Sequence, residues 1–494
     1  MRKHPWLTLT IAIIGLVALF YFGLDWLMER RWRNYEQDAH GRRVKLLLTD
    51  YATPPIPDDR NFAALPMMRA AFASAANPFT LPLRPNTKST PVTVNGQQTA
   101  FNLAALPPSL GDPIRGERID WTQWRKYFED VGFLKDETDD PAKDVLRALD
   151  HYAPPLQEWE QWGSRPECRF PLDFTQGITL SMSHLSLFQG AAKILGLRLR
   201  AHLATGNPEA AFADFEDSFQ GYRALKDEPS LISGLVRISI LALVVNEVGG
   251  GLQEHQWPDA ILQRITAELA TVRTFADYRF ALNSERGAMN VTFDSWIKAS
   301  VRERRRIAAA SLPYPGSPPA FVFEWLPRSV FRANQLQQNF FTDELVNQID
   351  ADNLAIDPDR ATPSSPLLIT GTVEQSYYFL CRESASVTER IRSRYMTMQT
   401  RLDETRLACA LERFYLAHGT YPGSLTELVP AFIAEIPPDV YARAPYLYQP
   451  VGKSSFRLYG VGENRKDDGG HIDPKKSESR QLDAVWLFAP PEAK

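Results

Sequence analysis

The stretch ALERFYLAHGTYPGSLTEL, from Ala410 to Leu428, carries the clearest structural signals in this chain of 494 residues. It begins inside an apolar stripe, from Leu407 to Tyr415, whose three- and four-residue spacing predicts one buried face of a helix. Gly419 is a natural helix stop. Ser424 and Glu427 have the spacing of a capping box, which predicts a second, short helix.

Three strand candidates follow the short helix. They are PYLYQP from Pro445, FRLYGV from Phe456 and DAVWLF from Asp483. Their aromatic and aliphatic residues, in part alternating with polar ones, are typical of half-buried strands. We therefore predict a small C-terminal α+β unit over residues 373–494, in which a short antiparallel sheet covers the long helix. A linker with several prolines and serines, residues 356–372, precedes it.

An acidic loop separates the last two strand candidates. Its oxygen-bearing residues are Asn464, Asp467, Asp468 and Asp473. Gly469-Gly470 lets the backbone turn tightly around an ion, and oxygen atoms are the ligands that calcium prefers. Arg465 and Lys466 reduce the local negative charge, and the spacing is not that of an EF-hand. The residues alone leave two interpretations, a calcium loop and a solvated loop.

Four C-terminal motifs make the stretch resemble the soluble domain of the major pseudopilin of type II secretion systems. In chain order they are HGTYP, LYGVG, DDGG and DAVW. The resemblance implies an exported domain with calcium ligands at Asp467, Asp468 and Asp483, and Asp473 as a further candidate. A pseudopilin's membrane helix carries a glutamate and continues directly into this domain. Here most of the chain lies between the two, so we expect a pseudopilin-like domain borrowed by a different anchored protein.

The N-terminal region contains an uncharged apolar segment, LTLTIAIIGLVALFYFGL, from Leu7 to Leu24. It is long enough to cross most of a bilayer as a helix. Trp6 and Trp26 bracket it, as aromatic residues do at membrane interfaces. Because no small-residue cleavage site follows, we predict an uncleaved transmembrane signal anchor over residues 1–28.

Positive charges lie on both sides of this segment. Arg2 and Lys3 precede it, and three arginines follow it between positions 30 and 33. Counting these charges favours a cytoplasmic body, whereas the pseudopilin resemblance favours an exported one. We predict a single-pass protein of the bacterial inner membrane with an extracytoplasmic body. A cytoplasmic-facing helical scaffold is the alternative.

The middle of the chain predicts a mainly helical protein of more than one unit. Residues 29–118 are interpreted as a helical stalk followed by a proline-rich irregular region, in which PVTVNGQQTAFNL could form a hairpin. Residues 119–355 are interpreted as a helical-bundle body. ISILALVV is too short for a second span and predicts a core helix. Gly249-Gly250-Gly251 then predicts a flexible end to that helix.

One helical hairpin of the body resembles a tetratricopeptide unit. The residues that carry this likeness are Gly206, Ala211, Phe215 and Ser218. A second copy at the expected period is missing, so the sequence predicts a single hairpin within a bundle and no repeat array.

No residue pattern identifies a reaction. The eight histidines are widely separated, the three cysteines lack paired spacing, and no nucleotide or nucleophile motif is present. The formal net charge of −4 gives no reason to expect nucleic-acid binding. The sequence therefore favours a non-enzymatic binding or assembly role with a protein partner. An enzyme whose site is assembled from distant residues of the helical body is the alternative.

Overall fold

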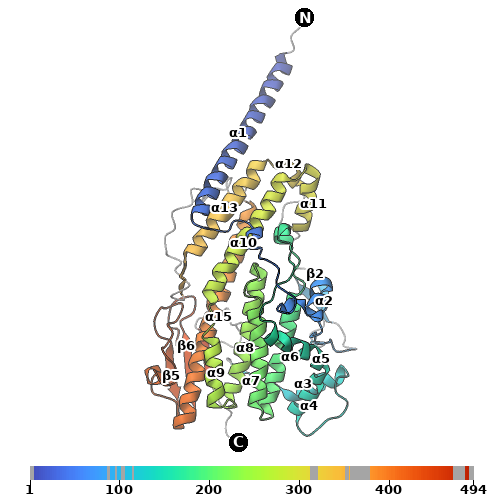
Figure 1. The fold of residues 1–494 in the computed structure, drawn as a ribbon. Coiled ribbons are helices and arrows are strands. Elements are labelled where there is room, and N and C mark those ends of the chain that lie inside the picture. The colour runs from blue at the N-terminus through green and yellow to red at the C-terminus, as the bar shows by residue number, and fades with distance from the viewer. Residues whose placement is uncertain are drawn as a thin grey trace.

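The computed structural model describes residues 5–85, 90–94, 97–101, 106–113, 116–311, 321–350, 355–356, 379–470 and 484–488. It is mainly helical, as predicted (Figure 1). The helices before the C-terminal unit are α1 (Pro5–Gly41), α2 (Pro66–Ser74), α3 (Trp121–Asp130), α4 (Pro141–Leu149), α5 (Ala153–Trp159), α6 (Leu185–Ala204), α7 (Pro208–Ala224), α8 (Leu231–Gln253), α9 (Asp259–Leu269), α10 (Thr274–Lys298), α11 (Val301–Ser311), α12 (Val322–Trp325) and α13 (Arg328–Asn347).

Short 3₁₀ helices and strands connect these elements. The 3₁₀ helices are η1 (Leu48–Tyr51), η2 (Phe62–Ala64), η5 (Asp150–Tyr152), η6 (Glu160–Ser164), η7 (Phe174–Thr179) and η8 (Leu425–Leu428). Strands β1 (Thr90–Val94) and β2 (Gln97–Phe101) pair antiparallel, which confirms the predicted hairpin. Strands β3 (Ile349–Asp350) and β4 (Ala355–Ile356) form a second antiparallel pair.

Helix α1 projects from one end of the body (Figure 1). Its apolar residues near the N-terminus, such as Leu19, point into solvent, whereas its last turns pack on α13. Trp32 and Tyr35 are buried there with Leu336, and the Tyr35 hydroxyl donates to Asp343 Oδ2 at 2.9 Å. One unbroken helix therefore joins the exposed apolar segment to the packed body.

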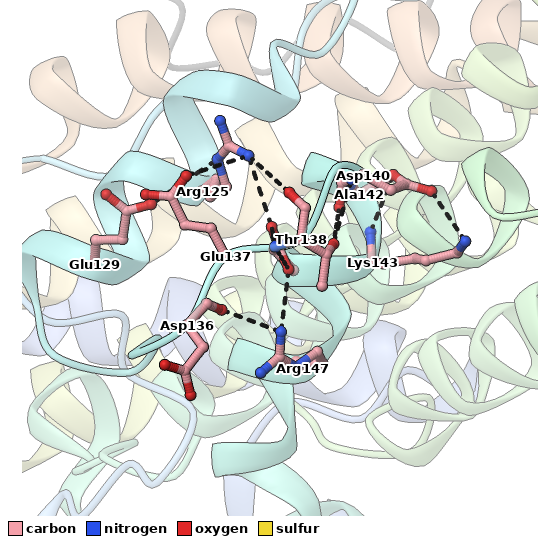
Figure 2. A network of polar contacts seen from close by, with 10 residues as sticks. Arg125, Glu129, Asp136, Glu137, Thr138, Asp140, Ala142, Lys143 and Arg147 are labelled. Carbon is pink, nitrogen blue, oxygen red and sulfur yellow. Dashed lines mark hydrogen bonds and ion pairs between the residues drawn. The ribbon is translucent and has the colours of Figure 1, made fainter.

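A buried carboxylate organises the connection between α3 and α4. Asp144 is fully buried, and its two oxygens accept the Thr138 backbone N–H at 3.0 and 2.9 Å. The Nη1 atoms of Arg147 and Arg125 lie 3.3 and 3.7 Å from this carboxylate. Figure 2 shows the two arginines approaching Thr138 from opposite sides. The polar α3–α4 loop is thus held by a paired charge.

Helices α6 and α7 form the predicted helical hairpin and pack on α8. Ala211, Phe215 and Ser218 are buried in it, and Gly206 turns the chain at φ 78°. More than half of the most apolar stretch of α8 is buried, and the helix runs through the body as a core helix.

The prediction of a flexible end at Gly249–Gly251 is wrong, because all three glycines lie inside α8 and are buried. A Cβ atom on Gly250 or Gly251 would overlap Arg200 or Trp257, respectively. The glycines permit close packing here.

The C-terminal unit has the predicted elements. Helix α15 (Phe379–His418) is followed directly by Gly419, whose φ is 72° and whose N–H donates to the Tyr415 carbonyl at 2.8 Å. The predicted short helix is the 3₁₀ turn η8. Strands β5 (Leu447–Val451), β6 (Ser455–Gly460) and β7 (Ala484–Phe488) form an antiparallel sheet in the order β5-β6-β7.

This unit shares its core with the rest of the protein. Helix α15 packs on α8, α9 and α10. Leu407 of α15 and Trp486 of β7 belong to the same apolar core as Trp124 of α3 and Leu195 of α6. The predicted linker lies outside the described residues except for Ile356, so the domain boundaries stay a prediction.

Candidate binding cleft

A proline-rich arm, residues 51–64, lies across the surface of the body beside the 165–172 segment. Its prolines leave few backbone N–H groups for helix formation, and side chains hold it instead. The Asn61 side chain donates to the Arg169 carbonyl at 3.0 Å and accepts the Arg169 N–H at 2.9 Å. Arg169 also donates to the Pro54 carbonyl at 2.6 Å, and Phe62 N–H to the Glu167 carbonyl at 2.7 Å.

A cleft of about 580 Å³ lies between this arm and the body, and we call it the arm cleft. Its apolar lining includes Tyr51, Ile56, Phe72, Phe170, Leu172 and Phe174. Its charged lining consists of Asp58, Arg69, Arg169, Asp227 and Glu228. This volume and this mixture of apolar walls with a few charged groups are typical of ligand sites.

Glu228 forms the polar part of the cleft wall, with its side chain 7% exposed. Its Oε2 lies 2.9 Å from Nε2 of His184, and its Oε1 accepts the Ser233 hydroxyl at 2.5 Å. His184 is fully buried and stacks on Phe170 with ring centroids 3.8 Å apart. The imidazole thus lies behind an aromatic wall and fixes the Glu228 carboxylate, which keeps lone pairs for a ligand.

Cys168 also lines the cleft, so residues distant in sequence do converge here, as the enzyme alternative requires. Burial, together with the negative charge of Glu228, raises the pKa of the Cys168 thiol well above its ordinary value. A thiol nucleophile needs a lowered pKa, usually from a neighbouring cation. The arrangement therefore suits binding better than thiol catalysis.

Charges at the mouth of the cleft are partly paired. Arg69 donates to Asp58 Oδ2 at 2.6 Å, and both side chains are exposed. Asp227 is exposed beside Glu228. Carboxylates outnumber guanidinium groups along the lining, which favours a ligand that carries a positive charge or several hydrogen-bond donors.

The predicted calcium loop lies elsewhere, beside β6. Asp467 Oδ1 accepts the Gly469 N–H at 2.9 Å and the Tyr459 hydroxyl at 3.3 Å. Asp468 Oδ2 accepts the Asn464 amide at 2.6 Å. Both carboxylates are exposed, and each accepts a hydrogen bond from another residue of the same loop.

The other two predicted ligands, Asp473 and Asp483, lie outside the described residues. Within the part of the chain that the structure describes, no three or more His, Cys, Asp or Glu side chains gather as a metal site. Calcium binding stays a prediction.

Sequence reasoning missed the arm cleft, although the prolines between positions 54 and 57 belong to the region that was predicted to be proline-rich and irregular. No sequence motif indicated the buried His184–Glu228 pair, because the two residues lie 44 positions apart in the chain. Comparisons of this chain with family models, with curated proteins and with solved structures give no match. The interpretation of the cleft therefore rests on its geometry.

Proposed function

We propose that the chain is a single-pass, membrane-anchored envelope protein that binds a partner segment in the arm cleft, without catalysing a reaction. The observation that carries the proposal is the cleft itself, with aromatic walls and a fixed carboxylate at Glu228. The anchor is α1, which is one of two described helices long and apolar enough to cross a membrane. The other is the core helix α8.

The ligand that fits the cleft is an apolar segment with a cationic end, such as a lysine or arginine side chain of a partner protein. Phe72 and Phe170 contact the apolar stem, and Glu228 accepts hydrogen bonds from the cationic group. A carboxylate ligand instead meets a wall in which negative charges prevail. The cleft should therefore bind positively charged ligands more tightly than negatively charged ligands of the same shape.

Hydrogen exchange of the full chain in lipid nanodiscs tests this proposal with two small probes of similar shape. We expect benzylammonium to slow amide exchange in residues 51–64 and 168–174, because a bound ligand stabilises the segments that contact it. Benzoate should leave these segments unchanged. Equal protection by both probes, or by neither, would contradict the proposal.

A matched pair of substitutions locates the effect. Ala64 lines the cleft, whereas Ala73 is exposed on α2 outside it. Ala64→Phe fills the cleft and should abolish protection by benzylammonium, and Ala73→Phe should retain it. Retention of protection in Ala64→Phe would show that the probe binds outside the cleft and would contradict the proposal.

We also propose that the body is extracytoplasmic and that the C-terminal unit is pseudopilin-like. A long helix that ends directly before Gly419 and is covered by a three-stranded antiparallel sheet supports this likeness. The proposed tetratricopeptide-like character of α6 and α7 is supported by the hairpin that they form.

A reporter fused after Lys494 tests the extracytoplasmic location of the body. Alkaline phosphatase should be active and a fluorescent protein should not fluoresce, and the reverse result would place the body in the cytoplasm.

A further inference from the structure

One end of the body lies beside the point on α1 at which the apolar segment ends. Asp25 directly follows that segment, and its Oδ1 accepts the Ser329 backbone N–H at the start of α13, at 2.7 Å. Helix α12 immediately precedes α13 and lies at the end of the body from which α1 emerges (Figure 1). If α1 spans a bilayer, α12 therefore lies at the bilayer surface.

Large aromatic side chains are exposed at this level. Trp325 of α12 is 80% exposed and Phe321 is 55% exposed. Trp26 of α1 is 58% exposed. Exposed aromatic rings in water cost free energy, whereas the headgroup region of a bilayer accommodates an apolar ring with a polar edge. Helices α1 and α12 thus each expose a tryptophan at the same level along the axis of α1.

Exposed arginines accompany these rings. Helix α11 packs along α12 through Arg304, which donates to the Leu326 carbonyl at 2.9 Å, and through the Arg305–Glu324 ion pair at 3.3 Å. Arg302 and Arg306 of α11 and Arg328 of α13 are exposed. Among the described residues these three form no ion pair. Planar guanidinium groups bind phosphate in a bidentate manner, so this charge is complementary to anionic headgroups.

We propose that this surface, which we call the α11–α12 face (301–306 and 321–328), lies on the membrane and binds anionic phospholipid headgroups. Trp325 and Phe321 enter the interface, and the three arginines contact lipid phosphates. The inference rests on the proposed anchoring by α1. Because α1 and the face attach the same body to the membrane at separate points, together they prevent the body from rotating about the anchor.

Photo-crosslinking of the full chain in nanodiscs tests the inference directly. A benzophenone amino acid replaces Trp325 in one variant, Leu19 of α1 in a second and Val451 of β5 in a third. All three positions are exposed, and β5 lies at the end of the body opposite α1 (Figure 1). The nanodiscs contain phosphatidylcholine alone or phosphatidylcholine mixed with phosphatidylglycerol.

We expect lipid adducts at positions 325 and 19 and none at 451. Adducts at 325 should increase when phosphatidylglycerol is present. Adding Arg302→Gln should reduce the adduct yield at 325 by about fivefold in these anionic nanodiscs, since one basic residue near the surface contributes on the order of 1 kcal/mol. Lys453→Gln, at the far end of the body, is the matched control and should leave the yield unchanged.

The outcomes separate the two proposals. Adducts at 19 with none at 325, or with crosslinks from 325 to protein only, would overturn the membrane-bound face and leave the anchor intact. Absence of adducts at 19 would overturn the anchor and the face together. Equal yields in the two lipid compositions would overturn the role of the arginines.

Trp325 is mostly exposed, so its replacement should leave the melting temperature unchanged, which circular dichroism checks.

Discussion

At the residue scale, Gly251 shows how tightly α8 packs against its surroundings. Its neighbour Trp257 is buried, and the Trp257 indole N–H donates to the Val248 carbonyl at 3.1 Å, which fixes the ring. We predict that Gly251→Ala lowers the free energy of unfolding by about 1–3 kcal/mol through overpacking. Thermal unfolding followed by circular dichroism measures the change.

Gly163→Ala in η6 is the control, because a Cβ atom there meets nothing within 4 Å. Equal melting temperatures for the two variants would contradict the close packing at Gly251.

Glu247 supplies a pH-dependent test of the buried core. It is 1% exposed, its Oε2 lies 3.7 Å from Nη1 of Arg200, and burial raises its pKa to about 7 despite that cation. The folded protein therefore holds a proton that the unfolded chain releases near pH 4.3, approximately the ordinary carboxyl pKa. Between these values the contribution of Glu247 to stability falls as pH rises.

Glu247→Gln removes this titration. We expect the melting temperature of the variant, relative to the wild type, to increase from about pH 5 to about pH 8, since each pKa unit corresponds to about 1.4 kcal/mol. Glu209→Gln, which changes an exposed carboxylate, is the control. A constant or decreasing difference for Glu247→Gln would show that this carboxylate is ionised throughout.

At the scale of elements, a buried carboxylate joins α15 to the end of α8. Glu412 accepts the Tyr421 hydroxyl at 2.9 Å, and its Oε1 lies 2.7 Å from Nδ1 of His255. Glu412→Ala leaves both partners without their acceptor, so we predict a loss of about 2 kcal/mol in stability and faster amide exchange in residues 415–428. Glu435→Ala, at an exposed position, should change neither quantity.

Local signals predicted several elements correctly. The apolar stripe and Gly419 predicted the end of α15, and alternation predicted strand β6. The buried polar side of α15 could not be predicted, because Asp403 and Glu404 are typical of a solvated face. They are buried since helices cover one side of α15 and the sheet another, and Arg406 and Arg401 pair with them.

At the scale of the whole molecule, contacts between segments far apart in the chain form features that the sequence alone does not indicate. The arm cleft combines the arm, α2, the 168–174 segment and the 227–229 turn, which are far apart in the chain. The prolines mark the arm in the sequence, but no local pattern shows which segments it packs against, so only the packing reveals the site. The apolar segment of α1, in contrast, was evident from the sequence, because its length and its lack of charged residues are local properties.

Membrane anchoring by α1 is the central claim, and alkaline carbonate extraction of membranes tests it most directly. Leu16 and Leu19 are 68% and 70% exposed on α1. An arginine at the centre of a span costs about 2.5–3.5 kcal/mol. We predict that the wild type and a Leu83→Arg control, changed on the exposed surface of the body, stay in the membrane pellet, and that Leu16→Arg/Leu19→Arg is released. Release of the wild type, or retention of the double variant, would contradict the claim.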